Sequence, residues 1–160
     1  MLVEEAVRSG KTLVEVTGGE PLAQAETLTL LSRLCDRFDS VLLETGGGIS
    51  IRGVDPRVRV ILDVKCPGSG MSGRMVRENL LLMREYRREL KFVVSHQRDF
   101  EWAVRFVQEN RLEDETLLVS PVMPGVAPDA LAEWVIESPV PFRMQLQLHK
   151  IIWPEGGDDR

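Results

Sequence analysis

The stretch Leu13-Val14-Glu15-Val16-Thr17-Gly18-Gly19-Glu20-Pro21 decides the fold. Its first five residues predict a short strand, and the glycine pair ends that strand in a turn. Gly18 and Gly19 have no Cβ, so their backbone groups can approach a ligand closely. Glu20 adds a negative charge and Pro21 stiffens the turn. Backbone carbonyls beside a carboxylate suit the ammonium group of a ligand.

Further strands and helices alternate almost to the end of the chain. Each predicted strand is a short run with strand character: 13–17, 41–45, 58–64, 91–95, 116–122 and 142–149. Apolar residues at helical spacing mark the predicted helices: Leu28, Leu31, Cys35 and Phe38; Val76, Leu80 and Met83; Phe100, Ala103, Val104 and Val107. We also predict a helix ending at Gly10, a helix capped by Asp99 and one opened by Pro128. This alternation predicts a parallel sheet with crossover helices.

Size and composition limit the classes of protein to consider. The chain has 160 residues, of which 43% are hydrophobic and 28% charged, as in an ordinary globular domain. Its net charge of -5 does not favour nucleic acid as a partner. It has no signal peptide and no apolar run long enough for a membrane span, so we expect a cytoplasmic protein without a membrane partner. Its two cysteines, Cys35 and Cys66, suit neither a disulfide framework nor a local metal knuckle.

Charged residues collect where the predicted strands end. In parallel α/β folds these ends share one edge, where ligand sites form. Period-two alternation places Glu15 with Thr17, and Asp63 with Lys65, on common faces. Two interpretations stay open at this point: a site for a polar ligand, or a buried network of ion pairs.

The same segments carry a family resemblance. Val16-Thr17-Gly18-Gly19-Glu20-Pro21 resembles the second-strand motif of radical S-adenosylmethionine enzymes, where it holds the amino group of that cofactor. The other segments resemble the 7-carboxy-7-deazaguanine synthase family of queuosine biosynthesis. They are similar to its "ETNG", "SPK", "ELKVV", "VQPM" and "Q-x-H-K" segments, in this order: 43–47, 63–67, 89–94, 119–123 and 145–150. The likeness extends from about residue 12 to about residue 153.

This resemblance implies a fold, a reaction and cofactors. The fold would be a partial TIM-like α/β barrel over residues 1–154, a single domain followed by a mobile tail at 155–160. The family is a radical lyase that converts 6-carboxy-5,6,7,8-tetrahydropterin to 7-carboxy-7-deazaguanine with loss of ammonia. It uses S-adenosylmethionine, a [4Fe–4S] cluster and Mg²⁺, and its members often form homodimers. Cluster and cofactor supply the chemistry, while the protein orients and shields them.

The resemblance also implies roles for individual residues. Gly18, Gly19 and Glu20 would hold the methionyl part of the cofactor, and Glu44 its ribose or amino group. Three further residues would lie near its carboxylate, ribose or adenine: Lys65, Ser120 and Val122. The pterin would contact Thr17 and His149, with Gln147 as a weaker candidate. No catalytic residue is assigned. Gly46 and Ser120 replace an Asn and a Gln of the family, which removes two polar contacts.

The cluster motif of the family has no counterpart in this sequence. Such enzymes bind [4Fe–4S] through three closely spaced cysteines after the first strand. Here Cys35 is predicted to lie in the core and Cys66 at a strand end, with packing as its expected role. We therefore expect a chain that lacks the first strand, the cluster loop and the Mg²⁺-binding Thr, and that is inactive alone. Two alternatives are a module that binds S-adenosylmethionine without radical chemistry, and another radical subfamily such as an activating enzyme.

Overall fold

A six-stranded parallel sheet forms the centre of the molecule. The computed structural model describes residues 2–153, except the side chains of Glu85, Arg87, His149 and Lys150. The strands are β1 (Leu13–Val16), β2 (Ser40–Thr45), β3 (Arg59–Lys65), β4 (Arg87–Val94), β5 (Thr116–Pro121) and β6 (Arg143–Met144). They lie side by side in sequence order, each parallel to the next.

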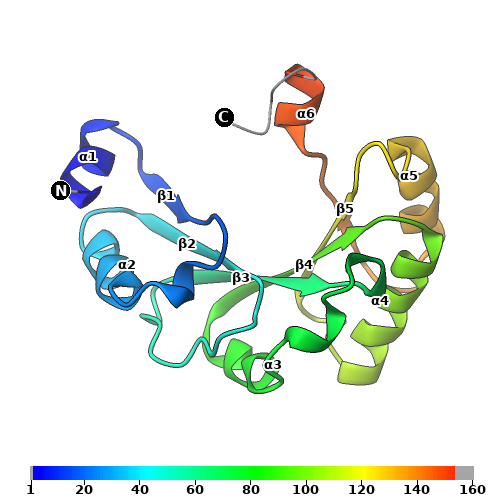
Figure 1. The fold of residues 1–160 in the computed structure, drawn as a ribbon, viewed down its shortest axis with the longest axis horizontal. Helices are drawn as coiled ribbons and strands as arrows, with labels where there is room; N and C mark the ends of the chain where they lie inside the picture. The colour runs from blue at the N-terminus through cyan, green and yellow to red at the C-terminus, as the bar shows by residue number, and fades with distance from the viewer. Residues whose placement is uncertain (1, 154–160) are drawn as a thin grey trace.

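Most of the helices lie on one face of this sheet. The helices are α1 (Leu2–Arg8), α2 (Thr27–Cys35), α3 (Glu78–Leu82), α4 (Gln97–Asn110), α5 (Pro128–Glu137) and α6 (Leu148–Ile152). Because the strand order never reverses, right-handed crossovers place the connecting helices on the same side, as in a barrel. Figure 1 shows α2, α3, α4 and α5 around the outside of a curved sheet whose inner face is open. The fold is therefore a partial barrel, as predicted.

The main core lies between the sheet and these helices. Alternate residues of the central strand β3, Val60, Leu62 and Val64, belong to it and are at most 2% exposed. Ile61 and Asp63 are also buried, but they lie on the opposite, inner face of β3. The inner face thus carries a buried carboxylate of its own.

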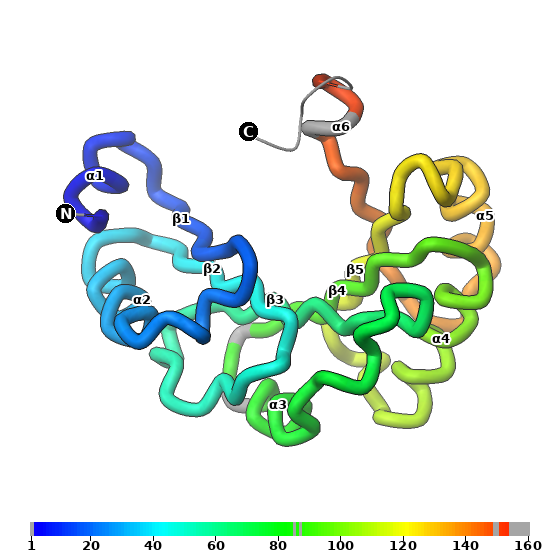
Figure 2. Tube along the Cα trace, in the orientation of Figure 1, coloured from blue at the N-terminus to red at the C-terminus, as the bar shows by residue number. Residues whose placement is uncertain are grey.

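Most predicted elements are present, with shifted ends. The helix predicted around Val76, Leu80 and Met83 is only the five-residue α3, flanked by the 3₁₀ turns η3 (Ser72–Arg74) and η4 (Met83–Glu85). Strand β4 starts earlier than predicted. Figure 2 traces the whole path and shows the N-terminal α1 and the C-terminal α6 at opposite sides of the open inner face.

The prediction of a last strand over 142–149 was wrong. β6 contains only Arg143 and Met144, and one more hydrogen bond, from Gln145 N–H to Val119 O (2.8 Å), extends its pairing. The chain then turns into α6. β6 pairs with β5 alone within residues 2–153, and Leu146 and Leu148 are 36% and 62% exposed. An alternating pattern needs a buried face to become a strand, and residues 145–148 have none.

Two remaining expectations concern the ends of the chain and membranes. The predicted mobile tail, 155–160, lies outside the described residues. Within residues 2–153, no helix combines the length and the apolar character needed to cross a bilayer.

Candidate active site

The glycine turn after β1 is the first part of the site. Gly18 and Gly19 have φ values of 97° and 58°, which glycine adopts far more readily than other residues. A Cβ at either position would meet nothing within 4 Å. These glycines suit the backbone conformation of the turn, and both are exposed.

The carboxylate of Glu20 joins this turn to the end of β2. It accepts hydrogen bonds from Leu22 N–H (3.1 Å), from Gly46 N–H (3.1 Å) and from the Thr45 hydroxyl (2.8 Å to Oε1). Lys65 also reaches this point, since a Cβ on Gly46 would lie 3.9 Å from Lys65 Cε and 3.7 Å from Glu20 Oε2. The ends of β1, β2 and β3 therefore meet around Gly46.

Two ion pairs continue along the inner face. Lys91 Nζ on β4 binds Glu44 Oε1 on β2 at 2.7 Å, and Lys65 binds Asp63 on β3. These charges therefore do form ion pairs. The ion pairs leave one polar atom unpaired, because Asp63 Oδ1 is buried and has no hydrogen-bond partner among the described residues. A buried acceptor of this kind suits an N–H or O–H donor of a bound molecule.

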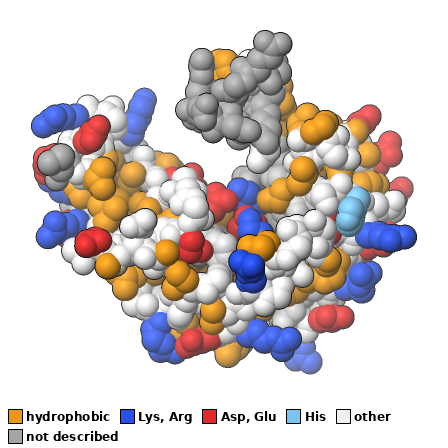
Figure 3. Space-filling model, in the orientation of Figure 1, with side chains coloured by type: hydrophobic (Ala, Val, Ile, Leu, Met, Phe, Trp, Pro, Cys, Tyr) orange, Lys and Arg blue, Asp and Glu red, His pale blue; other side chains and the backbone are white. Residues whose placement is uncertain are grey.

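A cavity of about 270 Å³ lies on this inner face. Its lining mixes charged and apolar side chains from five strands and the segment after β6: Glu15, Leu42, Glu44, Ile61, Glu89, Lys91, Leu118 and Gln145. Figure 3 shows acidic and basic side chains gathered in the central hollow of the molecule. Burial, reinforced by the nearby negative charge of Glu44, raises the pKa of Glu15 above its usual range.

The loop after β2 is held by Asn79, which sequence reasoning missed. This residue is fully buried; its amide nitrogen donates to Gly47 O (3.1 Å) and Ile49 O (2.9 Å), and its oxygen accepts from Ile51 N–H (3.0 Å). Gly47, with φ of 70°, lies so close to Leu62 that a Cβ would approach Leu62 Cδ1 to 2.7 Å. An Asn within an apolar run was the signal in the sequence, but its partners are about thirty residues away.

The loop after β3 is held in a similar way by Asp99. We predicted Asp99 as a helix cap, but His96 caps α4, its Nδ1 accepting from Asp99 N–H. The Asp99 carboxylate instead accepts from Gly68 N–H (2.8 Å) and from the N–H and hydroxyl of Ser95 (3.0 and 2.6 Å). This difference arises because the third residue of a helix can reach back past the cap.

The remaining predicted residues divide into two groups. Thr17 directly follows β1, Ser120 is buried in β5, and Val122 N–H donates to Val94 O (2.8 Å), so these residues lie at the carboxyl ends of the strands. Gln147 and His149 lie beyond β6, at the start of α6, and the side chain of His149 is outside the described part of the structure. The predicted cofactor residues thus lie together at the carboxyl ends of the strands, whereas the predicted pterin residues are divided between the end of β1 and the segment after β6.

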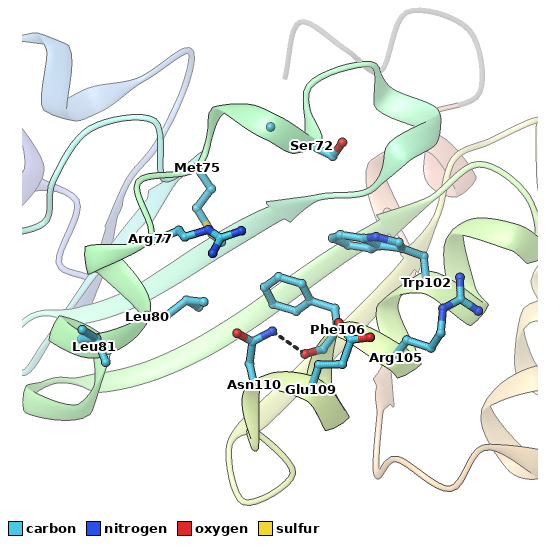
Figure 4. Close-up of a pocket in the computed structure, with 11 residues that line it drawn as sticks. Ser72, Met75, Arg77, Leu80, Leu81, Trp102, Arg105, Phe106, Glu109 and Asn110 are labelled. Atoms are coloured by element: carbon cyan, nitrogen blue, oxygen red, sulfur yellow. Dashed lines mark hydrogen bonds between the residues drawn. The ribbon is translucent and has the colours of Figure 1, made fainter.

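A larger cavity lies elsewhere. It has a volume of about 590 Å³ and lies between the β3–β4 connection and α4, on the helix-covered side of the sheet. Figure 4 shows Trp102 and Phe106 of α4 facing Met75, Arg77 and Leu80 across it. None of the predicted site residues lines this cavity. Size alone does not identify a site, and the strand ends remain the better candidate because they gather charge, open backbone and an unpaired buried acceptor.

Comparison with known proteins decides the family. No family model matches the chain. The 7-carboxy-7-deazaguanine synthase of Koribacter versatilis is 38% identical over 156 residues, covering 88% of this chain and 69% of that protein. The chain belongs to the 7-carboxy-7-deazaguanine synthase family. The synthase of Chlorobaculum tepidum is 46% identical over 143 residues, covering 88% of this chain and 65% of the relative.

One solved structure agrees with this assignment, and a second shares the fold. QueE from Escherichia coli matches 91% of this chain with a TM-score of 0.67 and 25% identity, and the match covers 62% of that protein. Streptococcus suis SuiB, solved with bound S-adenosylmethionine, shares the fold with a TM-score of 0.62, over 90% of this chain and 40% of SuiB. The chain therefore spans about two thirds of the length of the Chlorobaculum and Koribacter family members.

The described residues do not fit the iron–sulfur cluster of radical S-adenosylmethionine enzymes. Cys66 is 1% exposed within the core, where burial raises the pKa of its thiol to about 12. Cys35 packs at the edge of the core, and burial raises its pKa too. Among residues 2–153, no three His, Cys, Asp or Glu side chains are grouped so that they could hold a metal ion. A thiol with a raised pKa is a poor metal ligand, because the metal binds the thiolate.

Proposed function

We propose that this chain supplies the S-adenosylmethionine site and part of the pterin site of a 7-carboxy-7-deazaguanine synthase. The reaction proposed for the whole protein is the ring contraction of 6-carboxy-5,6,7,8-tetrahydropterin to 7-carboxy-7-deazaguanine. The joined ends of β1, β2 and β3 around Gly46 are the observation that carries this proposal. A homodimer, a cytoplasmic location and a role for Mg²⁺ remain predictions.

The residues at the strand ends fit S-adenosylmethionine in chemical terms. Its ammonium group suits the open carbonyls of Gly18 and Gly19 together with the Glu20 carboxylate, because all are acceptors. Its carboxylate suits the Lys65 ammonium, and its ribose hydroxyls suit acceptors such as Glu44 and Asp63. S-adenosylmethionine supplies the radical chemistry in this enzyme class when it is bound beside a cluster. This chain would bind and orient it.

The inner face suits a polar heterocycle next to that cofactor. Gln145 in the cavity lining offers an amide group, and Leu42, Ile61 and Leu118 offer apolar contact. Thr17, which directly follows β1, offers a hydroxyl. Gln147 and His149 would contribute if the segment after β6 folds over the open inner face. A closed inner face would shield a reactive intermediate from water.

A chimeric enzyme tests the proposed reaction. The part of the Chlorobaculum tepidum relative that this chain does not match is fused to the chain, and the chimera is purified without oxygen and supplied with iron, sulfide and S-adenosylmethionine. We expect it to form 7-carboxy-7-deazaguanine from 6-carboxy-5,6,7,8-tetrahydropterin. A chimera that holds a cluster and cleaves S-adenosylmethionine, yet leaves the pterin unchanged, would refute the proposed substrate.

A second function is favoured by the cysteine positions. With both thiols in or at the core, the chain would act as a module that binds S-adenosylmethionine without radical chemistry. The two functions predict different results for cleavage of S-adenosylmethionine by the chimera. A synthase chimera that holds a cluster should cleave it, whereas a binding module should bind S-adenosylmethionine and a cluster without cleaving the cofactor.

A further inference from the structure

Thr45 is a buried polar residue at the end of β2 that the proposed function has not used. It is 1% exposed, and its hydroxyl lies 2.8 and 2.9 Å from the two carboxylate oxygens of Glu20. The same oxygen accepts a hydrogen bond from Gly47 N–H at 3.1 Å. Thr45 therefore connects the Glu20 carboxylate to the glycine loop that follows β2.

The bonds around Glu20 show what this connection achieves. An ionised carboxylate has about four acceptor positions. Thr45, Gly46 N–H and Leu22 N–H occupy three of them, each from within the protein. The Thr45 hydroxyl faces both carboxylate oxygens but has one proton, so one further position stays available to a ligand ammonium group. Because three donors fix the plane of the carboxylate, they also fix the directions from which a ligand can approach it.

We propose that Thr45 is the positioning residue for the amino-acid end of S-adenosylmethionine. It acts through Glu20, and the inference rests on the proposed function of this site. The hydroxyl orients the carboxylate toward the ligand and holds the turn at Gly18 and Gly19 against the loop at Gly46 and Gly47. Thr45 itself does not contact the cofactor.

This role predicts an effect that differs from loss of packing. Val has nearly the shape of Thr, so Thr45→Val keeps the buried volume but removes the only side-chain donor to Glu20 among the described residues. Hydrogen bonds to charged groups are among the stronger ones in proteins, so we expect S-adenosylmethionine affinity to fall about tenfold or more. Thr45→Ser restores the hydroxyl and should restore most of the affinity.

Calorimetric titration of the 160-residue chain with two ligands tests the proposal. S-adenosylmethionine carries the amino-acid group, whereas 5′-methylthioadenosine shares its nucleoside and sulfur but lacks that group. Thr45→Val should weaken binding of the first and leave binding of the second unchanged. Thr116→Val is the control, because it makes the same substitution at the start of β5, at the opposite end of the strands from Glu20. Its affinity for both ligands should equal that of the wild type.

Each outcome is decisive for one of the two claims. If the wild-type chain binds neither ligand, the proposed function fails, and the inference about Thr45 fails with it. If the wild type binds S-adenosylmethionine and Thr45→Val binds it equally well, the inference is refuted while the proposed function stands. Equal weakening of both ligands would refute it too, since that result indicates general damage to the site. Should Thr45→Val fail to fold, Thr45→Ala takes its place, with Thr45→Ser again as the rescue.

Discussion

At the scale of single residues, the carboxylate of Asp99 joins α4 to the loop after β3. It is 1% exposed and accepts three hydrogen bonds, from Ser95 and Gly68. Burial alone would raise its pKa, but the hydrogen bonds from Ser95 and Gly68 outweigh burial and hold the pKa of Asp99 below its usual range. Asp99 therefore stabilises the fold in its ionised form.

Asp99→Asn should destabilise the chain by about 2 kcal/mol near neutral pH, because bonds to a charged acceptor are lost. A folded-state pKa below the unfolded value of about 3.9 means that the stabilisation is full above that value and is lost as the pH falls through the folded pKa. The free energy of unfolding, measured with urea from pH 7 down into the acid range, should therefore fall less steeply with decreasing pH for the variant than for the wild type. An equally steep fall in both proteins would contradict this role.

Gly68 shows that close packing, as well as hydrogen bonding, holds the same loop. A Cβ at Gly68 would overlap with Ser95 Oγ and Asp99 Oδ2, whereas a Cβ at Gly73 would meet nothing within 4 Å. We expect Gly68→Ala to cost about 1–3 kcal/mol through overpacking, and Gly73→Ala to be neutral or slightly stabilising. Thermal unfolding of the two variants measures this difference, and equal melting temperatures would refute the proposed contact.

Residue patterns predicted only part of these arrangements. The Gly18–Pro21 turn was visible because its residue types follow one another in sequence. Thr45 and Asn79 were not recognised, since each acts through hydrogen bonds to segments about 25 to 30 residues away. Cys66 was correctly predicted to serve packing, because a lone thiol after an apolar strand seldom has another role.

At the scale of elements, the loop between β2 and β3 depends on Asn79 of α3. Asn79→Ala removes three buried hydrogen bonds and should cost about 2–4 kcal/mol, with Gly47 O, Ile49 O and Ile51 N–H left unpaired. Asn110→Ala is the control: it removes one exposed hydrogen bond, to Phe106 O, and should change stability by no more than about 0.5 kcal/mol. Urea unfolding of both variants tests this, and a small effect at Asn79 would contradict the structure.

The central strand β3 was easier to predict than the short helix α3 for a physical reason. β3 is a near-continuous apolar run because it is buried on both faces, and such runs are recognisable in sequence. α3 has only five residues, and its pattern extends into the neighbouring 3₁₀ turns, so the prediction was too long. The segment after β6 alternates like a strand, but it lacks a buried face.

At the scale of the whole molecule, the strand order distinguishes this fold from other α/β folds. Alternating strands and helices predict a parallel sheet but do not give its order, and the partial barrel was predicted from the family resemblance alone. The order β1 to β6 brings Gly18, Gly46 and Lys65 to one edge of the sheet, although they are far apart in sequence.

The whole chain should not assemble an iron–sulfur cluster. Because both cysteines have raised pKa values and are not grouped with other ligands in residues 2–153, anaerobic treatment with iron and sulfide should produce no [4Fe–4S] signal in the optical and paramagnetic resonance spectra. A stoichiometric cluster in the chain alone would show that the cysteine assignment is wrong.

A titration shows directly whether the strand ends, rather than the 590 Å³ cavity beside α4, bind S-adenosylmethionine as proposed. The nitrogen-15-labelled chain is titrated with S-adenosylmethionine and followed by its amide resonances. We expect saturable shifts of the Gly18, Gly19 and Gly46 amides, with no change at the indole N–H of Trp102. Saturable shifts centred on Trp102, or no shift at the glycines in a folded chain, would contradict this proposal.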